Sequence, residues 1–118
     1  MVINITLRGI DKLERFLKKK SVEIERLTNK GVEEAGEFLK SEIQASIKGE
    51  RAESRSVSTG EFLNSVEARN GVVSSDVPQA KFLEFGTRKV HERRHFRNSA
   101  DRSKHKIKDI LGDALKKL

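Results

Sequence analysis

The sequence contains no cysteine, no tryptophan and no tyrosine, and it has one proline and six phenylalanines among 118 residues. Without cysteine there is no disulfide framework and no thiolate metal site. No stretch approaches the roughly 20 apolar residues that span a bilayer, and the start of the chain lacks the apolar core of a signal peptide. We therefore expect a soluble protein that is made in a cytoplasm and contacts no membrane.

The balance of residue types predicts one domain with a thin core. Hydrophobic residues make up 35% of the chain and charged residues 36%. A chain of this length forms a single domain, residues 1–118, and buries roughly two-thirds of its unfolded surface. Long helices with solvated charged faces, or an apolar surface completed by a partner subunit, account for this balance.

The positive charge is concentrated in the last quarter of the chain. Residues 1–47 hold nine Lys/Arg against eight Asp/Glu, and residues 48–87 hold five against six. Residues 88–118 hold eleven against four, so this basic C-terminal region carries the whole net charge of +7. Such a region is typical of a nucleic-acid patch, of a docking surface for an acidic protein, or of a solvated helix face.

The first part of the chain predicts a strand followed by a short helix. Residues 2–8 alternate between apolar and polar side chains, which is the period of a half-buried strand. Asp11 followed by Glu14 is a helix-start signal, and it predicts a short helix over residues 11–17. The strand is expected to end at Gly9, before the helix, because glycine interrupts the alternating pattern.

A much longer helix is predicted over residues 22–48, with Ser21 as its cap. Apolar residues repeat at intervals of three or four throughout this stretch. At 1.5 Å per residue the helix would be about 40 Å long. Gly31 and Gly36 lie inside it, and each marks either close packing or a break into two pieces.

The middle of the chain predicts a loop and a hairpin. Residues 48–60 have one large apolar residue and no period, so we expect a mobile loop that orders on contact with a neighbour, or else a plain exposed connector. A turn of helix from Glu61 and a strand over residues 65–69 lead to Asn70-Gly71. This pair is a strong hairpin signal, and the return strand should end near Asp76.

The last part predicts a third strand of the meander over residues 80–85, and a final helix over about residues 99–118. The predicted fold class is therefore α+β. A small antiparallel sheet, made of the N-terminal strand and a hairpin or meander, packs against the long central helix and the C-terminal helix.

One catalytic motif occurs, because residues 91–95, His-Glu-Arg-Arg-His, fit the H-E-x-x-H pattern of zinc proteases. The surrounding arginines and lysines oppose the binding of a dication. The third ligand is also missing, since His105 lies ten residues after His95, outside the usual spacing. We expect no catalytic, cofactor-binding or metal-binding residue and no enzymatic activity. A zinc-dependent hydrolase stays as a remote alternative.

Two other motifs favour a structural role. The stretch Thr-Gly-Glu-Phe-Leu-Asn-Ser-Val covers residues 59–66, and Phe-Leu-Glu-Phe-Gly-Thr-Arg covers residues 82–88. Neither supplies a nucleophile, a metal cage or a phosphate loop. In the second, Gly86 suits a backbone angle closed to other residues, and Thr87 can cap the next turn of the chain. The motif therefore sets the geometry of the chain.

Across residues 59–100 the chain resembles the tail-completion, or head–tail joining, proteins of tailed bacteriophages. Their pattern is Thr-Gly-x-Leu-x-x-Ser-Ile, then Tyr-Ala-x-x-x-Glu-Phe-Gly-Thr, then Arg-Pro-Phe-Leu-x-Pro-Ala. Gln79 replaces the tyrosine here, and His95 and Ser99 replace the prolines. The matching residues are Thr59, Gly60, Phe62, Ser65, Val66, Ala80, Glu84, Phe85, Gly86, Thr87, Arg94, Phe96 and Ala100.

The resemblance implies a structural protein that acts by binding, without turnover. Several copies would form a homo-oligomeric ring at the head-proximal end of the tail. The ring would bridge the tail tube or tail terminator protein to the connector or head-completion protein of the capsid. The protein would be made in the cytoplasm of a bacterial host and would end at the neck of a virion or tail-like particle. The basic region allows a weak contact with DNA, and the alternative function is a small basic nucleic-acid-binding protein without base readout.

We expect partner contacts in two segments, because aromatic and arginine anchors dominate many interfaces. Replacing Glu84 with alanine should leave the fold intact but impair the joining of head to tail. Each phenylalanine in the set is either a core residue or an interface anchor. The interface residues are Glu84, Phe85, Gly86, Thr87, Arg88, Arg94 and Phe96, and the assembly-loop residues are Arg51, Arg55, Thr59 and Gly60.

Overall fold

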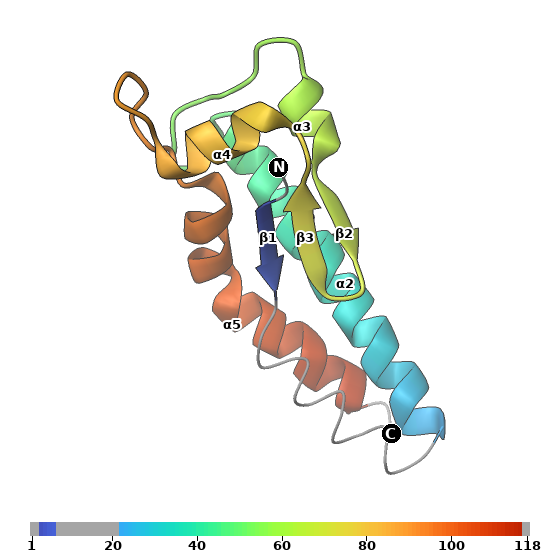
Figure 1. The fold of residues 1–118 in the computed structure, drawn as a ribbon. Helices are drawn as coiled ribbons and strands as arrows, with labels where there is room; N and C mark the ends of the chain where they lie inside the picture. Colours follow the sequence, from blue (N-terminus) through green and yellow to red (C-terminus); the bar gives the residue numbers. More distant parts are fainter. Residues whose placement is uncertain (1–2, 7–21, 117–118) are drawn as a thin grey trace.

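The computed structural model describes residues 3–6 and 22–116 (Figure 1). The predicted short helix over residues 11–17 lies outside the described residues. The elements form an α+β arrangement in which helices pack against an antiparallel hairpin, and this prediction of the fold class is confirmed. In chain order they are β1 (Ile3–Thr6), α2 (Val22–Ile47), α3 (Glu61–Ser65), β2 (Glu67–Arg69), β3 (Val72–Ser75), α4 (Pro78–Phe85) and α5 (His95–Leu115).

Helices α2 and α5 lie side by side along the length of the molecule (Figure 1). Helix α2 is continuous over 26 residues, as the apolar repeat predicted. A Cβ atom on Gly31 would lie 3.0 Å from Cβ of Ala114, so this glycine lets α2 approach α5 closely. A Cβ atom on Gly36 would lie 3.6 Å from Cβ of Ala68 in β2. Gly31 therefore marks close packing, an alanine would fit at Gly36, and neither glycine breaks the helix.

The sheet has the strand order β1-β3-β2 and is antiparallel throughout. Asn70 and Gly71 join β2 to β3 with φ angles of 53° and 78°. Positive φ at both central residues is the signature of the two-residue hairpin turn that Asn-Gly favours, which confirms the predicted hairpin. Ile3 of β1 pairs with Ser75 of β3.

The prediction of a strand over residues 80–85 is wrong, because α4 occupies residues 78–85. Pro78 stands in the first turn of this helix, where its missing N–H costs nothing and its fixed φ suits the helix. Ala80 and Glu84 are buried, whereas Phe82 is exposed. Burial thus repeats every four residues. The alternation of side chains that suggested a strand did not reflect which of them face the core.

The core runs along α2, between this helix, β3 and α5, and it extends to the end where α3 and α4 pack. The rings of Phe62 and Phe96 stack there with their centroids 6.4 Å apart. Helix α5 begins at His95, four residues earlier than predicted. The loop over residues 48–60 contains no helix or strand, as expected. The fully buried apolar residues of this core are Ala35, Leu39, Ile43, Ile47, Val66, Val73, Ala80 and Phe96.

Candidate functional site

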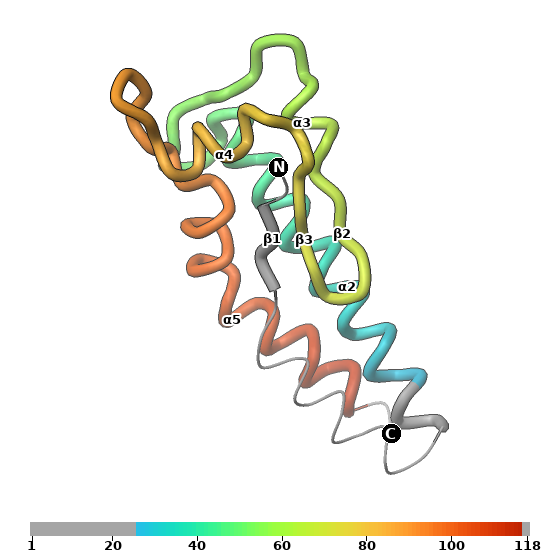
Figure 2. The backbone as a smooth tube through the Cα atoms, viewed as in Figure 1, coloured from blue at the N-terminus to red at the C-terminus, as the bar shows by residue number. Residues whose placement is uncertain are grey.

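The two segments predicted to meet partners lie at the same end of the molecule. The loop over residues 48–60 leaves the end of α2, and the loop over residues 86–94 leads into α5 (Figure 2). They touch, because Nη1 of Arg93 donates a hydrogen bond to the carbonyl oxygen of Arg55 at 3.0 Å. We call residues 48–65 and 78–97 the loop end. Folding therefore brings together residues that lie 38 positions apart in the sequence.

Glu84 serves as the cap of α5. Its Oε1 accepts a hydrogen bond from the backbone N–H of Phe96 at 2.9 Å, and its Oε2 accepts one from the N–H of Arg97 at 3.1 Å. Nε of Arg97 also donates to Oε2 at 2.8 Å. The residue before the helix, Arg94, has a φ of 53° and makes no side-chain cap. A carboxylate at this position satisfies free N–H groups and interacts favourably with the helix dipole.

The role of Glu84 corrects one expectation. Its side chain is 2% exposed, so it is occupied within the fold and is not presented to a partner. Its alanine variant should lose the cap that ties α4 to α5, and with it part of the stability of the fold. The expectation that alanine leaves the fold intact does not agree with this geometry.

Gly86 and Thr87 fix the turn after α4. Gly86 has a φ of 77°, and its N–H donates to the carbonyl of Phe82 at 2.8 Å. A Cβ atom here would lie 3.0 Å from the backbone nitrogen of Glu92. The N–H of Thr87 donates to the carbonyl of Val90 at 2.8 Å, and the Thr87 hydroxyl accepts from the N–H of Val90 at 3.0 Å. The predicted glycine angle and threonine cap are both present.

Two aromatic side chains of α4 are exposed. Phe82 is 49% exposed and Phe85 is 53% exposed, and they are the exposed large hydrophobic residues of the described chain. The guanidinium carbon of Arg97 lies 4.8 Å from the centroid of the Phe85 ring, a cation–π distance. Phe96, by contrast, is fully buried. Phe82 was not among the residues predicted to meet a partner, although a helix over this stretch places it on the face of Phe85.

The loop end is rich in unpaired positive charge. Residues 81–97 contain six Lys/Arg and two Asp/Glu. One of these carboxylates, that of Glu84, is buried under α5. Among the described residues no ion pair involves Arg88 or Arg94, which are both exposed. We call the exposed set the aromatic–basic surface, and it consists of Lys81, Phe82, Phe85, Arg88, Lys89 and Arg94.

A chain of buried and partly buried hydrogen bonds ties the first loop to both helices. Nη1 of Arg93 donates to Oγ of Ser56 at 2.8 Å, and Ser56 Oγ lies 2.7 Å from Nε2 of His95. Nδ1 of His95 lies 2.7 Å from Oγ of Ser46, which donates to Oε1 of Glu53 at 2.5 Å. Since Ser46 donates to the carboxylate, it accepts from His95, whose proton then resides on Nδ1. Burial lowers the pKa of His95, which keeps the ring neutral in this arrangement.

Glu53, which ends this chain of hydrogen bonds, forms an ion pair with Arg102. Its two oxygens accept hydrogen bonds from Nη1 and Nη2 of Arg102, both at 2.7 Å, and one also accepts from Nδ2 of Asn98 at 3.2 Å. The Arg102 guanidinium lowers the pKa of Glu53 to about 2. Bidentate arginine–carboxylate pairs are among the stronger polar contacts in proteins. The loop is therefore fastened at its centre rather than at its ends alone.

The predicted assembly-loop residues make mostly local contacts. Nε of Arg51 donates to Oε2 of Glu42 at 2.9 Å, and this hydrogen bond lowers the pKa of Glu42. Nη1 of Arg55 donates to a backbone carbonyl at the end of α2, at 3.1 Å. Gly60, with a φ of 86°, precedes α3, and the hydroxyl of Thr59 accepts from the first N–H of that helix at 3.3 Å. These contacts shape the loop.

The geometry of a zinc protease is not formed at residues 91–95. His91 is exposed and lies before α5, whereas His95 is fully buried and has both ring nitrogens engaged by serine hydroxyls. Two histidines on one helix face are what the motif requires. In residues 3–6 and 22–116, no group of three or more His, Asp or Glu is arranged to hold a metal ion.

Comparison with known proteins does not identify the chain, because no family model, curated protein or solved structure matches it. Within the part that the structure describes, no helix is both long enough and apolar enough to cross a membrane.

Proposed function

We propose that this protein is a structural subunit of a tailed bacteriophage or related particle, which completes the tail or joins head to tail at the neck. One observation carries the proposal. The three motif segments at residues 59–66, 84–87 and 94–96 converge at the loop end. There Glu84 and Gly86 hold α4 in a fixed position, and Phe82 and Phe85 are exposed beside it. Such an arrangement suits a rigid docking surface.

The protein would act by binding, with no catalytic step. Its partners would be further copies of itself in a ring, the connector or head-completion protein, and the tail tube or tail terminator protein. Half-exposed aromatic rings with adjacent arginines are the side chains that contribute most to many protein interfaces. Phe85, stacked on Arg97, and Phe82 are the anchors on this surface, and the unpaired Arg88 and Arg94 would meet carboxylates of the neighbour.

The proposal is tested by locating the protein in particles. An epitope-tagged chain would be expressed in its host, particles would be induced and purified by sedimentation, and the tag would be located by immunogold electron microscopy. Label at the neck, or at the upper end of the tail, is the expected result. A protein that stays soluble while the particles carry no label would exclude the role.

Paired variants separate the surface from the fold. Phe82→Ser with Phe85→Ser removes the two exposed rings, and Lys104→Ser changes an exposed residue in the middle of α5. Both proteins should fold, as judged by circular dichroism. The double variant should yield unjoined heads and tails, and the lysine variant should give normal particles. Equal infectious yields from the two would contradict the role of the aromatic rings.

A second candidate function is binding of nucleic acid without sequence preference, favoured by the charge of residues 88–118. Helix α5 exposes Lys104, Lys106 and Lys108 in addition to the basic loop before it. Neutralising several phosphates would make affinity fall steeply with salt. Titration of duplex DNA at 50 and 200 mM salt measures this slope. Tight binding with a steep slope by the isolated protein would favour this function over a purely structural joint.

A further inference from the structure

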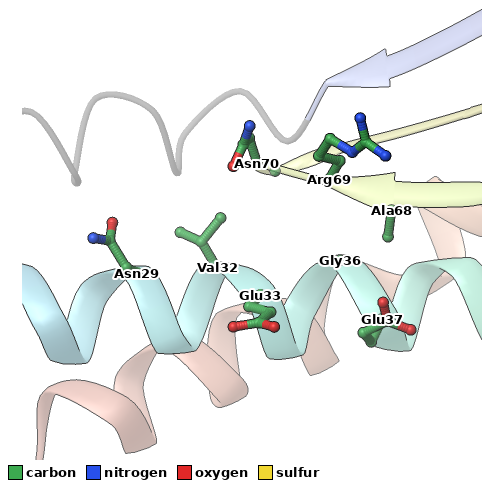
Figure 3. Close-up of a pocket in the computed structure, with 9 residues that line it drawn as sticks. Asn29, Val32, Glu33, Gly36, Glu37, Ala68, Arg69 and Asn70 are labelled. Atoms are coloured by element: carbon green, nitrogen blue, oxygen red, sulfur yellow. The ribbon is translucent and has the colours of Figure 1, made fainter.

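A pocket beside Ser56 contains chemistry that the other hollows of the molecule lack. The groove between α2 and the hairpin has a volume of about 660 Å³, and among the described residues no serine, threonine or histidine lines it (Figure 3). The pocket beside Ser56 is smaller, about 340 Å³. It lies between the loop over residues 48–60, α3 and α4, and Ser56 and Arg93 form part of its wall.

The hydroxyl of Ser56 is paired with a base that is held in one orientation. Ser56 Oγ lies 2.7 Å from Nε2 of His95. Because Ser46 fixes the ring proton on Nδ1, Nε2 is free to accept the proton of Ser56. The ring of Phe62 packs beside the imidazole, with the centroids 6.0 Å apart. A serine hydroxyl that donates to a fixed, neutral imidazole is the arrangement that activates serine nucleophiles.

The charges around this pair suit a transfer of the hydroxyl proton. Such a transfer leaves negative charge on Ser56 and positive charge on His95. Nη1 of Arg93 donates to Ser56 Oγ at 2.8 Å, so it stabilises the negative charge. The carboxylate of Glu53 is connected to the imidazole through one serine hydroxyl, so it stabilises the positive charge. The charged groups that face the imidazole from the two loops, α4 and α5 are Glu53, Glu84, Arg93 and Arg102.

We propose that Ser56 is a nucleophile that accepts a small acyl group from an activated ester or thioester. Its Oγ forms a bond to the acyl carbon, and the bond from that carbon to the leaving oxygen or sulfur breaks. The hydroxyl proton passes to Nε2 of His95 and then to the leaving group, so the products are acylated Ser56 and an alcohol or thiol. The reaction modifies the chain once, without turnover, and is separate from the joining role proposed above.

The pocket suits an acyl group of a few carbons. Val57, Phe62 and Leu83 contribute apolar side chains to its lining. Its volume is at the lower end of the range for small-molecule sites. The carboxylate in the lining, that of Glu61, belongs to an exposed residue, so solvent and salt screen its charge. A short, uncharged acyl group therefore fits beside Ser56.

The base is a feature of this chain and not of the pattern that the chain resembles. In the bacteriophage pattern described above, proline stands at the position of His95. Proline has no side-chain group that accepts a proton. The pairing of Ser56 with a base is thus independent of the resemblance.

Reaction with p-nitrophenyl acetate tests the nucleophile. Purified protein is incubated with the ester near neutral pH, and acetylated peptides are quantified over time by mass spectrometry. Ser56 should be acetylated about a hundredfold faster than any other serine, because a positioned general base contributes about that factor or more. The rate should decrease only below pH 6.5, where the buried His95, whose pKa is lowered, takes up a proton.

Two variants separate the nucleophile from its surroundings. Ser56→Ala should lose the fast acetylation, whereas Ser54→Ala, an exposed position of the same loop outside the pocket, should keep the wild-type rate. Circular dichroism should show that both are folded.

Ser56→Cys gives an independent measure, because the chain has no other cysteine. Its alkylation by iodoacetamide as a function of pH yields the pKa of the thiol. With His95 and Arg93 beside it, this pKa should lie below about 7.5, compared with about 8.5 for a free cysteine.

Acetylation confined to lysines, equal rates at Ser54 and Ser56, or an ordinary thiol pKa in Ser56→Cys would each overturn the inference. These measurements use the purified chain, so their outcome is independent of where the protein lies in a particle. Neck labelling without acetylation of Ser56 would remove this inference alone, whereas acetylation without labelling would remove the proposed function alone.

Discussion

Replacing Glu84 with glutamine tests whether the buried carboxylate organises the start of α5. The carboxylate accepts three hydrogen bonds, from two backbone N–H groups and from Nε of Arg97, at 2.8–3.1 Å. Glutamine keeps the shape of the side chain but loses the charge. Its NH₂ group must also face one of these donors, since an amide has one acceptor oxygen.

The cost depends on the hydrogen bonds that the change removes. A hydrogen bond to a charged group contributes about 1.5–3 kcal/mol, and loss of a helix cap costs about 0.5–2 kcal/mol. Because Arg97 is 32% exposed, water can solvate part of what is lost. We expect Glu84→Gln to lower the free energy of unfolding by about 2 kcal/mol. Glu84→Ala, which also leaves a buried N–H unpaired, should lower it by about 3–4 kcal/mol.

Urea unfolding followed by far-ultraviolet circular dichroism measures this loss, since the chain has no tryptophan or tyrosine for fluorescence. Glu92→Gln is the matched control. Glu92 lies 3.4 Å from the same arginine and is 40% exposed, so its loss should cost at most about 0.5 kcal/mol. If Glu84→Gln were as stable as this control, the assignment of Glu84 as the cap of α5 would be wrong.

The other predictions concern glycine positions and pH. Gly36→Ala should raise the free energy of unfolding, measured in urea, by about 1 kcal/mol, because the added Cβ makes only an ordinary van der Waals contact. Gly31→Ala should bring no such gain, because its Cβ would lie 3.0 Å from Cβ of Ala114. Gly86→Ala should lower the thermal midpoint, since the residue has a φ of 77° and no room for a Cβ. Stability should decrease as the pH falls below 6.5: the pKa of His95 is lowered in the folded state, so the unfolded chain takes up the proton first. A further loss of about 3 kcal/mol should follow as Glu53 is protonated, because its pKa is about 2 in the fold against an ordinary 4.5, and Glu53→Gln should abolish that step.

Local patterns predicted most of the regular elements. The apolar repeat of α2 and the Asn70-Gly71 turn depend on neighbours in the sequence, and both were found where expected. The strand predicted over residues 80–85 was wrong because Pro78 can both end a strand and begin a helix. A pattern of eight residues does not distinguish these roles. Residues 78–85 form a helix because its face with Ala80 and Glu84 packs on the core.

The cap of α5 could not be predicted from the residues next to the start of this helix. The residue before the helix supplies no side-chain cap, and the group that does so, Glu84, lies in another helix. Glu84 and Gly86 were predicted to belong to a motif that sets the geometry of the chain, but Glu84 was also predicted to face a partner. The exposed Phe82 was missed for the same reason, since its exposure follows from the helical form of α4.

The amino-acid sequence by itself determined the α+β class, the long central helix, the hairpin and the basic end, because these follow from composition, periodicity and turn chemistry within short stretches. Only the tertiary structure decided which charged groups are buried and paired inside the fold. Glu53 and Glu84 are buried by partners 49 and 13 residues away, whereas Arg88 and Lys89 stay unpaired in the described structure. The physical reason is that burial and pairing depend on contacts between distant segments, and these exist only once the chain has folded.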